Sequence, residues 1–186
     1  GAYADRDLSI AFEPRTGSGA ALRAVATGES LLGIIGSTTL IRAVAQGAPV
    51  VPLALLYQRA LAVLYTTRDA FGEPFERVAQ LRGRRIGMPV GSEIGLLGRL
   101  YLRQAGVADD VTVVDLRGEE RTALLTGQVD VVTGSLSDPA RIGTAGTTVD
   151  TIPIAEKFPI YGPALVARQT SLETTPSLLA DFLAGT

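Results

Sequence analysis

Four glycine- and hydroxyl-rich turns contain the residues of this chain that are best suited to holding a ligand. Glycine lets a ligand approach the backbone, and a serine or threonine hydroxyl can donate and accept hydrogen bonds. A turn that begins a helix also presents unpaired N–H groups and partial positive charge, a combination that binds anions. The alternative is that these hydroxyls only cap helices. The ligand-binding residues that we predict in these turns are Ser18, Gly19, Ser37, Thr38, Gly91, Ser92, Glu93, Gly134 and Ser135.

Further candidates lie near two breaks in the pattern of the chain. Arg59 could clamp an anion through two hydrogen bonds, or it is a solvated arginine at a strand end. Gln58 beside it can donate and accept. Tyr161 could stack on a flat ring or pack between elements, whereas Glu93 as a contact favours an amine or a pyrimidine over an anion. A small organic anion and a pyrimidine-like nutrient therefore both stay open as ligands.

Several kinds of chemistry are excluded by composition. The chain has no cysteine and no histidine, which removes thiolate chemistry, disulfides, histidine-based triads and the usual zinc sites. The turn ending at Ser92 lacks the lysine of a phosphate-binding Walker motif. A net charge of -2 argues against nucleic acid as a partner. We expect a protein with no catalytic residues, no metal and no cofactor.

The elements that must position these residues follow from a repeat. Residues 21–28 lead through an apolar run to Gly36-Ser37, and residues 122–127 lead through another to Gly134-Ser135. Each copy reads as a helix, a Thr-Gly stop, a buried strand and a Gly-Ser turn. Two matched α/β units predict two similar lobes whose strand-end loops share a ligand.

Alternating apolar runs and amphipathic segments predict an α/β fold in which each lobe is a mostly parallel sheet flanked by helices. The predicted strands are 8–12, 31–35, 50–57, 61–66, 85–88, 111–116, 129–132, 149–154 and 164–168. The predicted helices are 17–26, 39–45, 75–81, 93–104, 119–125, a short one from Ser137, and 171–183. No run of eighteen apolar residues occurs.

The breaks near 58–61 and 159–163 predict where the chain passes between lobes. Lobe 1 is expected to be discontinuous, over residues 1–60 and 161–186, and lobe 2 to span 61–160. The two crossings would form a hinge. The abrupt start, with no hydrophobic opening strand and no signal peptide, suggests a fragment or a processed product.

Motifs spread over nearly the whole chain match a known family in order and spacing. They are Gly17-Ser18-Gly19, Ala26-Thr27-Gly28-Glu29, Ala45 to Val51, Leu81 to Gly87, Gly91-Ser92 and Leu125 to Asp130. With these motifs the chain resembles the periplasmic substrate-binding proteins of ABC importers for sulfonates, nitrate, taurine and thiamine-precursor pyrimidines. Yeast-type thiamine pyrimidine synthases share that family's fold.

The resemblance implies a two-lobed type II periplasmic-binding-protein fold joined by two hinge crossings. It implies a small-molecule ligand in the interlobe cleft, hinge closure around it, and a membrane permease as partner. It also implies a monomer located in the periplasm or anchored as a cell-surface lipoprotein. Against the family pattern, the opening strand and the C-terminal helices are missing, so we expect a chain truncated at both ends.

Two other functions stay open on the same resemblance. A pyrimidine synthase would use a pyridoxal-phosphate lysine, a histidine and a cysteine-rich segment, and here Lys157 is the only lysine. The ligand-sensing domain of a regulator or receptor has the same architecture, so the fold cannot separate it from an importer component. Sequence upstream of Gly1 would separate them.

Overall fold

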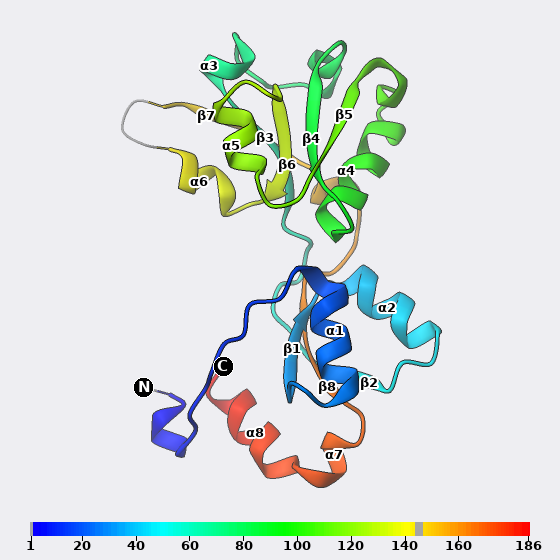
Figure 1. Cartoon of the computed structure of the whole chain (residues 1–186), viewed down its shortest axis with the longest axis vertical. Coiled ribbons are helices and arrows are strands. Elements are labelled where there is room, and N and C mark those ends of the chain that lie inside the picture. The colour runs from blue at the N-terminus through cyan, green and yellow to red at the C-terminus, as the bar shows by residue number, and fades with distance from the viewer. Residues whose placement is uncertain (1, 144–146) are drawn as a thin grey trace. The chain divides into compact units, whose positions relative to one another are not determined.

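The computed structural model describes residues 2–143 and 147–186, and these form two compact units. Unit 1 comprises Gly1–Gln58 and Tyr161–Thr186, and unit 2 comprises Arg59–Ile160. The chain therefore leaves unit 1 after Gln58 and returns to it at Tyr161. Figure 1 shows each unit as a sheet with helices packed on it.

Unit 1 is built on a three-stranded sheet in the order β1-β8-β2. Its elements are η1 (Ala4–Arg6), α1 (Gly17–Thr27), β1 (Leu32–Ile35), α2 (Ser37–Ala45), β2 (Val50–Leu55), β8 (Ala164–Arg168), α7 (Ser171–Thr174) and α8 (Pro176–Ala184). The α/β class with helix-flanked sheets is confirmed. The expected parallel pairing is wrong in this unit: β8 lies between β1 and β2 and runs antiparallel to both. Periodicity identifies strands but not their order, so the inserted β8 was not anticipated.

The core of unit 1 lies where α1 packs on β1 and β8. Val25, Ile35 and Val166 are completely buried there. Gly33 allows this close packing, because a Cβ atom at Gly33 would lie 2.8 Å from Val25 Cγ2. The helix thus sits directly on the strand that leads to Gly36 and Ser37.

Residues 8–12, predicted as a strand, form none. They run as an extended blue connection between η1 and α1 in Figure 1. In the described part of the chain, no backbone hydrogen bond joins residues 9–14 to another segment. Alternating apolar residues need a neighbouring strand to form a ladder, and none lies beside this segment.

Unit 2 is built on a five-stranded sheet in the order β5-β4-β6-β3-β7. Its elements are β3 (Ala62–Thr67), α3 (Arg68–Phe71), η2 (Val78–Leu81), β4 (Arg85–Pro89), α4 (Glu93–Gln104), η3 (Ala108–Asp110), β5 (Thr112–Leu116), α5 (Glu120–Leu125), β6 (Val131–Ser135), α6 (Asp138–Ile142), β7 (Val149–Pro153) and η4 (Ala155–Lys157). Strand β4 pairs in parallel with β5 and β6, as expected. Strand β3 pairs antiparallel with β6 and β7.

Both faces of the unit 2 sheet are buried, because alternate residues of each strand point to opposite faces. On one face Leu64, Ile86 and Leu97 belong to a core built with α4. On the other, Tyr65 and Leu124 belong to a core built with α5. Strand β3 is buried along its whole length.

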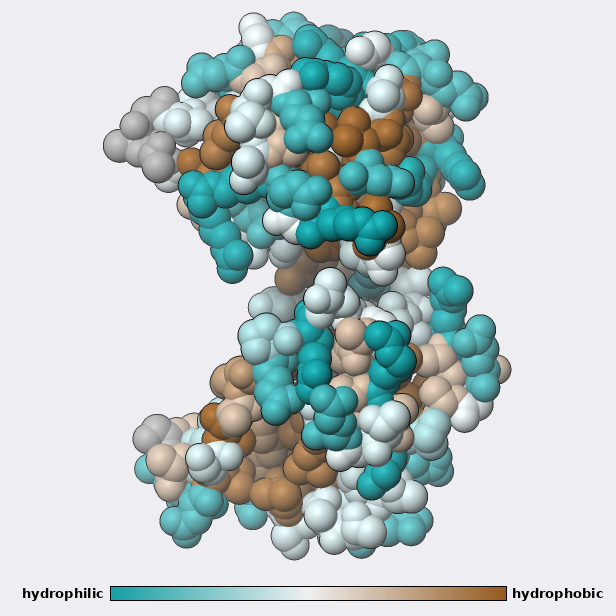
Figure 2. Space-filling view, in the orientation of Figure 1, coloured by the Kyte–Doolittle hydropathy of each residue, from teal (hydrophilic) through white to brown (hydrophobic). Residues whose placement is uncertain are grey.

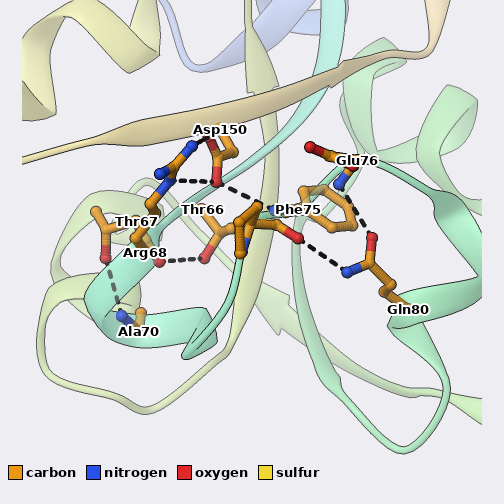
Figure 3. Close-up of polar contacts among 9 residues, drawn as sticks. Thr66, Thr67, Arg68, Ala70, Phe75, Glu76, Gln80 and Asp150 are labelled. Carbon is orange, nitrogen blue, oxygen red and sulfur yellow. Dashed lines mark hydrogen bonds and ion pairs between the residues drawn. The ribbon is translucent and has the colours of Figure 1, made fainter.

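A polar cluster replaces most of the helix predicted over residues 75–81, of which only η2 forms. Figure 3 shows Asp150 accepting hydrogen bonds from Arg68 and from the backbone N–H of Phe75. The Gln80 side chain accepts from the N–H of Glu76 and donates to Pro74. These side chains give partners to backbone groups of the segment before η2. The cluster is internally paired and structural.

The helix predicted over residues 171–183 is divided. It consists of α7 and α8, which are separated at Thr175. Pro176 lacks an N–H group and so takes the first position of α8, where a helix needs no donor.

Candidate functional site

Most of the ligand residues predicted in unit 1 lie beside one edge of its sheet. This edge is formed by the ends of β1 and β2 and the start of β8. Ile35 at the end of β1 and Leu55 at the end of β2 both pair with Ala164, the first residue of β8. The residues that follow β1 and β2, or precede β8, therefore lie at the same edge. Those predicted residues are Ser37, Thr38, Gln58 and Tyr161.

A hydrogen bond of Ser18 joins the start of α1 to this edge. The Ser18 hydroxyl oxygen accepts a hydrogen bond from the backbone N–H of Gly36 at 3.0 Å. The O–H proton of Ser18 is not used by any residue in the described part of the chain. Ser18 can therefore donate to a ligand without releasing Gly36. Its neighbour Gly19 is exposed in the first turn of α1.

Ser37 has a structural partner at the same edge. It is the first residue of α2, its side chain is buried, and its hydroxyl donates to the backbone carbonyl of Tyr161. The bond joins the segment that returns from unit 2 to the N-terminus of α2. The Tyr161 ring is more than half exposed, as is that of Tyr57, while Gln58 is exposed and Thr38 is half-buried. Both rings are accessible for stacking.

In unit 2 the predicted residues also share one sheet edge. Strands β4 and β6 are parallel neighbours, so Gly91, Ser92 and Glu93 after β4 lie at the same edge as Ser135 at the end of β6. Ser135 pairs with Ala62, the first residue of β3. Arg59 lies three residues before Ala62, so it is near the same edge.

Ser92 is an N-cap, the alternative that its sequence position left open. Its hydroxyl accepts from the backbone N–H of Gly95 at 3.0 Å and donates to the carbonyl of Pro89 at 3.1 Å. The donor of Ser92 is therefore already used within the protein. Glu93 is half-buried in the first turn of α4, where the helix dipole favours a carboxylate. Gly91 has a φ of +68°, which suits glycine at this turn.

Asp138 bonds the end of β6, although it was not among the residues predicted to bind a ligand. Its carboxylate accepts from the backbone N–H of Ser135 at 2.7 Å. Gly134 is required here, since a Cβ atom would lie 2.6 Å from Asp138 Oδ2 and 2.6 Å from Tyr65 Cε1. Burial, and then the charge of Asp138, raises the pKa of the Tyr65 phenol well above its usual range. Tyr65 thus stays neutral beside this carboxylate.

Two arginines are available for an anion at the unit 2 edge. Arg59 is exposed, and in the described part of the chain it takes part in no ion pair. Arg117, which sequence reasoning missed, follows β5 at the same edge and is likewise exposed and outside the described ion pairs. The signal for Arg117 was its place next to Gly118 in a strand-end loop, as in the other four turns.

These two edges offer hydrogen-bond donors, exposed rings and cations. Among residues 2–143 and 147–186, no cluster of three or more acidic, histidine or cysteine side chains is placed to hold a metal ion. Within the same residues, no helix has both the length and the apolar character needed to cross a bilayer.

Comparison with known proteins gives a family match and a set of fold relatives. The family model described as NMT1/THI5 like matches residues 1–186. The periplasmic aliphatic sulphonate binding protein SsuA from Escherichia coli has a TM-score of 0.70 and 24% identity, over 92% of this chain and 58% of that chain. The alkanesulfonate-binding protein SsuA from Xanthomonas axonopodis pv. citri, bound to MOPS, has a TM-score of 0.68 and 20% identity, over 92% of this chain and 59% of that chain.

A relative with a different ligand has the same fold. A Salmonella typhimurium periplasmic binding protein with high arginine specificity has a TM-score of 0.65 and 16% identity, over 99% of this chain and 76% of that chain. No curated protein sequence matches the chain. The chain spans less than two thirds of the two sulfonate-binding proteins, and identities this low show the fold alone.

Proposed function

The chain belongs to the NMT1/THI5 like family, and on this basis we propose that it is the solute-binding component of an ABC importer. It acts outside the cytoplasm, in the periplasm or as a lipoprotein at the cell surface. It works as a monomer that binds a small molecule and presents it to the membrane permease.

One observation carries this proposal: each unit gathers its predicted ligand residues at a single sheet edge. In unit 1, Ser18 bonds Gly36 and Ser37 bonds Tyr161. In unit 2, Ser92 follows β4 and Ser135 ends β6, its parallel neighbour. The chain also passes twice between the units. A ligand that contacts both edges would stabilise a closed state by hinge motion, and the permease would recognise that state.

The ligand that these residues suit best is a small organic anion. The N-termini of α1 and α2 come together at the Ser18–Gly36 hydrogen bond, and helix N-termini favour anions. Arg59 and Arg117 add two cations without described ion-pair partners. Two relatives in fold bind sulfonates, which supports this class. A pyrimidine-like nutrient, stacked on Tyr57 or Tyr161 and bonded to Glu93, is the alternative ligand.

The residues favour binding over catalysis. A lysine that forms a Schiff base is normally desolvated so that its amine is neutral. Lys157, the only lysine, is exposed at the end of η4. The chain also has no histidine and no cysteine to assist such a reaction. We therefore propose that the protein is not a pyrimidine synthase.

The proposal is tested by thermal unfolding with single ligands: ethanesulfonate, taurine, MOPS, nitrate, arginine and a hydroxymethylpyrimidine. A ligand at a hundred times its Kd adds about 2.7 kcal/mol to the free energy of unfolding. In a protein of this size that raises Tm by roughly 5–10 °C. A Tm that none of the six ligands moves would contradict the proposal. A rise with ethanesulfonate but not with the pyrimidine would favour the anion.

A further inference from the structure

The two crossings between the units carry hydrogen bonds at defined backbone groups. On the unit 1 side, the N–H of Gly162 donates to the carbonyl of Tyr57 at 3.0 Å. On the unit 2 side, the N–H of Ala60 donates to the carbonyl of Ile160 at 2.9 Å. Each bond joins residues of the same unit. The two bonds therefore mark where each unit ends along both crossings.

On the returning crossing, the change from unit 2 to unit 1 falls on a single residue, Tyr161. A peptide group is planar, so the carbonyl of one residue and the N–H of the next move together. The peptide group between Ile160 and Tyr161 is bonded within unit 2, and the one between Tyr161 and Gly162 is bonded within unit 1. These two groups share only the Cα atom of Tyr161. Rotation of one unit against the other therefore turns the φ and ψ bonds of Tyr161.

On the outgoing crossing, two residues separate the bonded groups. The carbonyl of Tyr57 is the last backbone group held in unit 1, and the N–H of Ala60 is the first one held in unit 2. In the part of the chain that the structure describes, the backbone of Gln58 and Arg59 between them makes no hydrogen bond. Gln58, Arg59 and Tyr161 are therefore the residues through which the units can turn.

Ser37 holds the unit 1 side of this turning point. It is the first residue of α2 and is only 5% exposed, and its hydroxyl donates to the carbonyl of Tyr161 at 2.5 Å. The peptide group after Tyr161 is thus bonded at both polar atoms, its carbonyl to Ser37 and its N–H to Tyr57. Without Ser37 only the second bond would remain. Gly162, which has no Cβ atom, could then turn as well.

We propose that Ser37 is a positioning residue, which confines the rotation of the returning crossing to Tyr161. It acts on the motion of the units through a backbone carbonyl and not through contact with the ligand. A buried hydroxyl whose proton is given to a carbonyl is poorly placed to donate to a solute. The inference rests on the hinge motion of the proposed function, but it does not depend on which ligand is bound.

Pulsed electron spin resonance between two spin labels measures this motion without a ligand. The chain has no cysteine, so Ile41→Cys on α2 and Arg103→Cys on α4 would be the only labelled sites, one in each unit. Both residues are exposed. Neither lines the apolar groove of unit 1 beside residues 8–13, β1 and α8, which is brown in Figure 2. The labels therefore avoid a surface on which two copies of the chain could associate.

We expect Ser37→Ala to broaden the distribution of distances between the labels by roughly twofold or more, because the returning crossing gains a second rotating residue. The matched control, Thr66→Val, removes a buried hydroxyl that donates to the carbonyl of Asp130 at 2.6 Å within unit 2. It loses a bond of the same kind and should keep the wild-type width. A wild-type width in Ser37→Ala, or equal broadening in both variants, would overturn the proposal.

Hydrogen exchange tests the position of the turning point in the unsubstituted protein, so it does not need a variant that folds. We expect the amides of Gly162 and Ala60 to exchange at least about tenfold more slowly than those of Gln58, Arg59 and Tyr161. Equal exchange across these five residues would overturn the proposal. Neither measurement uses a ligand, so a failure here is distinguishable from a Tm that no ligand moves.

Discussion

The Ser18 hydroxyl and the backbone N–H of Gly36 are joined by a 3.0 Å hydrogen bond that connects the starts of α1 and α2. The bond holds two helix N-termini side by side at the edge where β1 ends. It uses only the acceptor of the hydroxyl, so one side chain can both position the edge and contact a ligand.

Replacing Ser18 by alanine removes this connection. We expect Ser18→Ala to lower the free energy of unfolding by about 1 kcal/mol, since the Gly36 N–H loses its partner. If the ligand is an anion at this edge, its affinity should also fall. Denaturant unfolding and calorimetric titration measure the two effects. Ser9→Ala, an exposed serine without a described hydrogen bond, is the control and should leave both unchanged.

Ser92 is expected to act through the helix it caps. Ser92→Ala should lower the free energy of unfolding by about 1 kcal/mol, because the N–H of Gly95 is left without its acceptor. Ser92→Asp keeps an acceptor at the N-cap and should retain most of the stability. Equal losses in both variants, measured by urea unfolding, would show that capping is not what Ser92 contributes.

Two glycines at predicted ligand positions should respond in opposite directions. Gly134→Ala places a Cβ atom 2.6 Å from Tyr65 and Asp138 and should destabilise the protein by about 1–3 kcal/mol. Gly19→Ala lies in α1, where the nearest atom would be 3.9 Å away, and should stabilise it by up to about 1 kcal/mol. The same urea experiment compares them. A loss of stability in Gly19→Ala would mean that the start of α1 is tighter than the structure shows.

Arg59 should matter for an anion and not for a neutral ligand. We expect Arg59→Gln to weaken binding of an alkanesulfonate by about tenfold or more, through loss of charge-assisted hydrogen bonds. Arg103→Gln removes an exposed arginine near the end of α4, away from the predicted edge, and should have no effect. Isothermal titration of both variants gives the comparison, and equal affinities would move the anion site away from Arg59.

The ion pair between Asp130 and Arg85 should contribute to the stability of unit 2 in a pH-dependent way. Hydrogen bonds from Arg85, one of them at 2.7 Å, lower the pKa of the Asp130 carboxyl. Because the folded-state pKa lies below the unfolded one, the contribution is fully present above the ordinary aspartate pKa, about 4. It is lost as pH falls through the lowered folded value.

Asp130→Asn should therefore destabilise the protein at pH 7 and flatten the decline in Tm below about pH 4. Asp109→Asn, at an exposed aspartate without a described ion pair, is the control and should keep the wild-type slope. If Asp130→Asn kept that slope too, the carboxylate would not be a source of acid sensitivity.

Elements with strong local signals were predicted well from the sequence. The helix expected over residues 93–104 is confirmed as α4, because Ser92 caps an amphipathic run with a glycine soon after its end. The strand predicted over residues 8–12 does not form, because a segment with alternating apolar residues becomes a strand only where a neighbouring strand is present to pair with it. The helix expected over residues 75–81 forms only as η2, Val78–Leu81, and the N–H groups of Phe75 and Glu76 before it bond the side chains of Asp150 and Gln80.

The predicted site depends partly on information that the sequence lacks. Strand-end turns could be found from glycine and serine alone, and the register then shows which of them share an edge. Asp138 was missed, since nothing in the local pattern separates it from surface charges, and Arg117 was missed although it stands next to Gly118 in a strand-end loop. The hydrogen bonds of the folded chain show in addition that the Ser37 and Ser92 hydroxyls donate to the carbonyls of Tyr161 and Pro89.

The central position of β8 imposes an order on biosynthesis. Strands β1 and β2 do not pair with each other, and each pairs with β8. Residues 164–168, which form β8, leave the ribosome only after the whole of unit 2. The nascent N-terminal segment therefore stays unassembled while some hundred later residues are made, during which unit 2 can already fold as a domain. A translational stop anywhere before residue 164 would leave unit 1 without its central strand, β8.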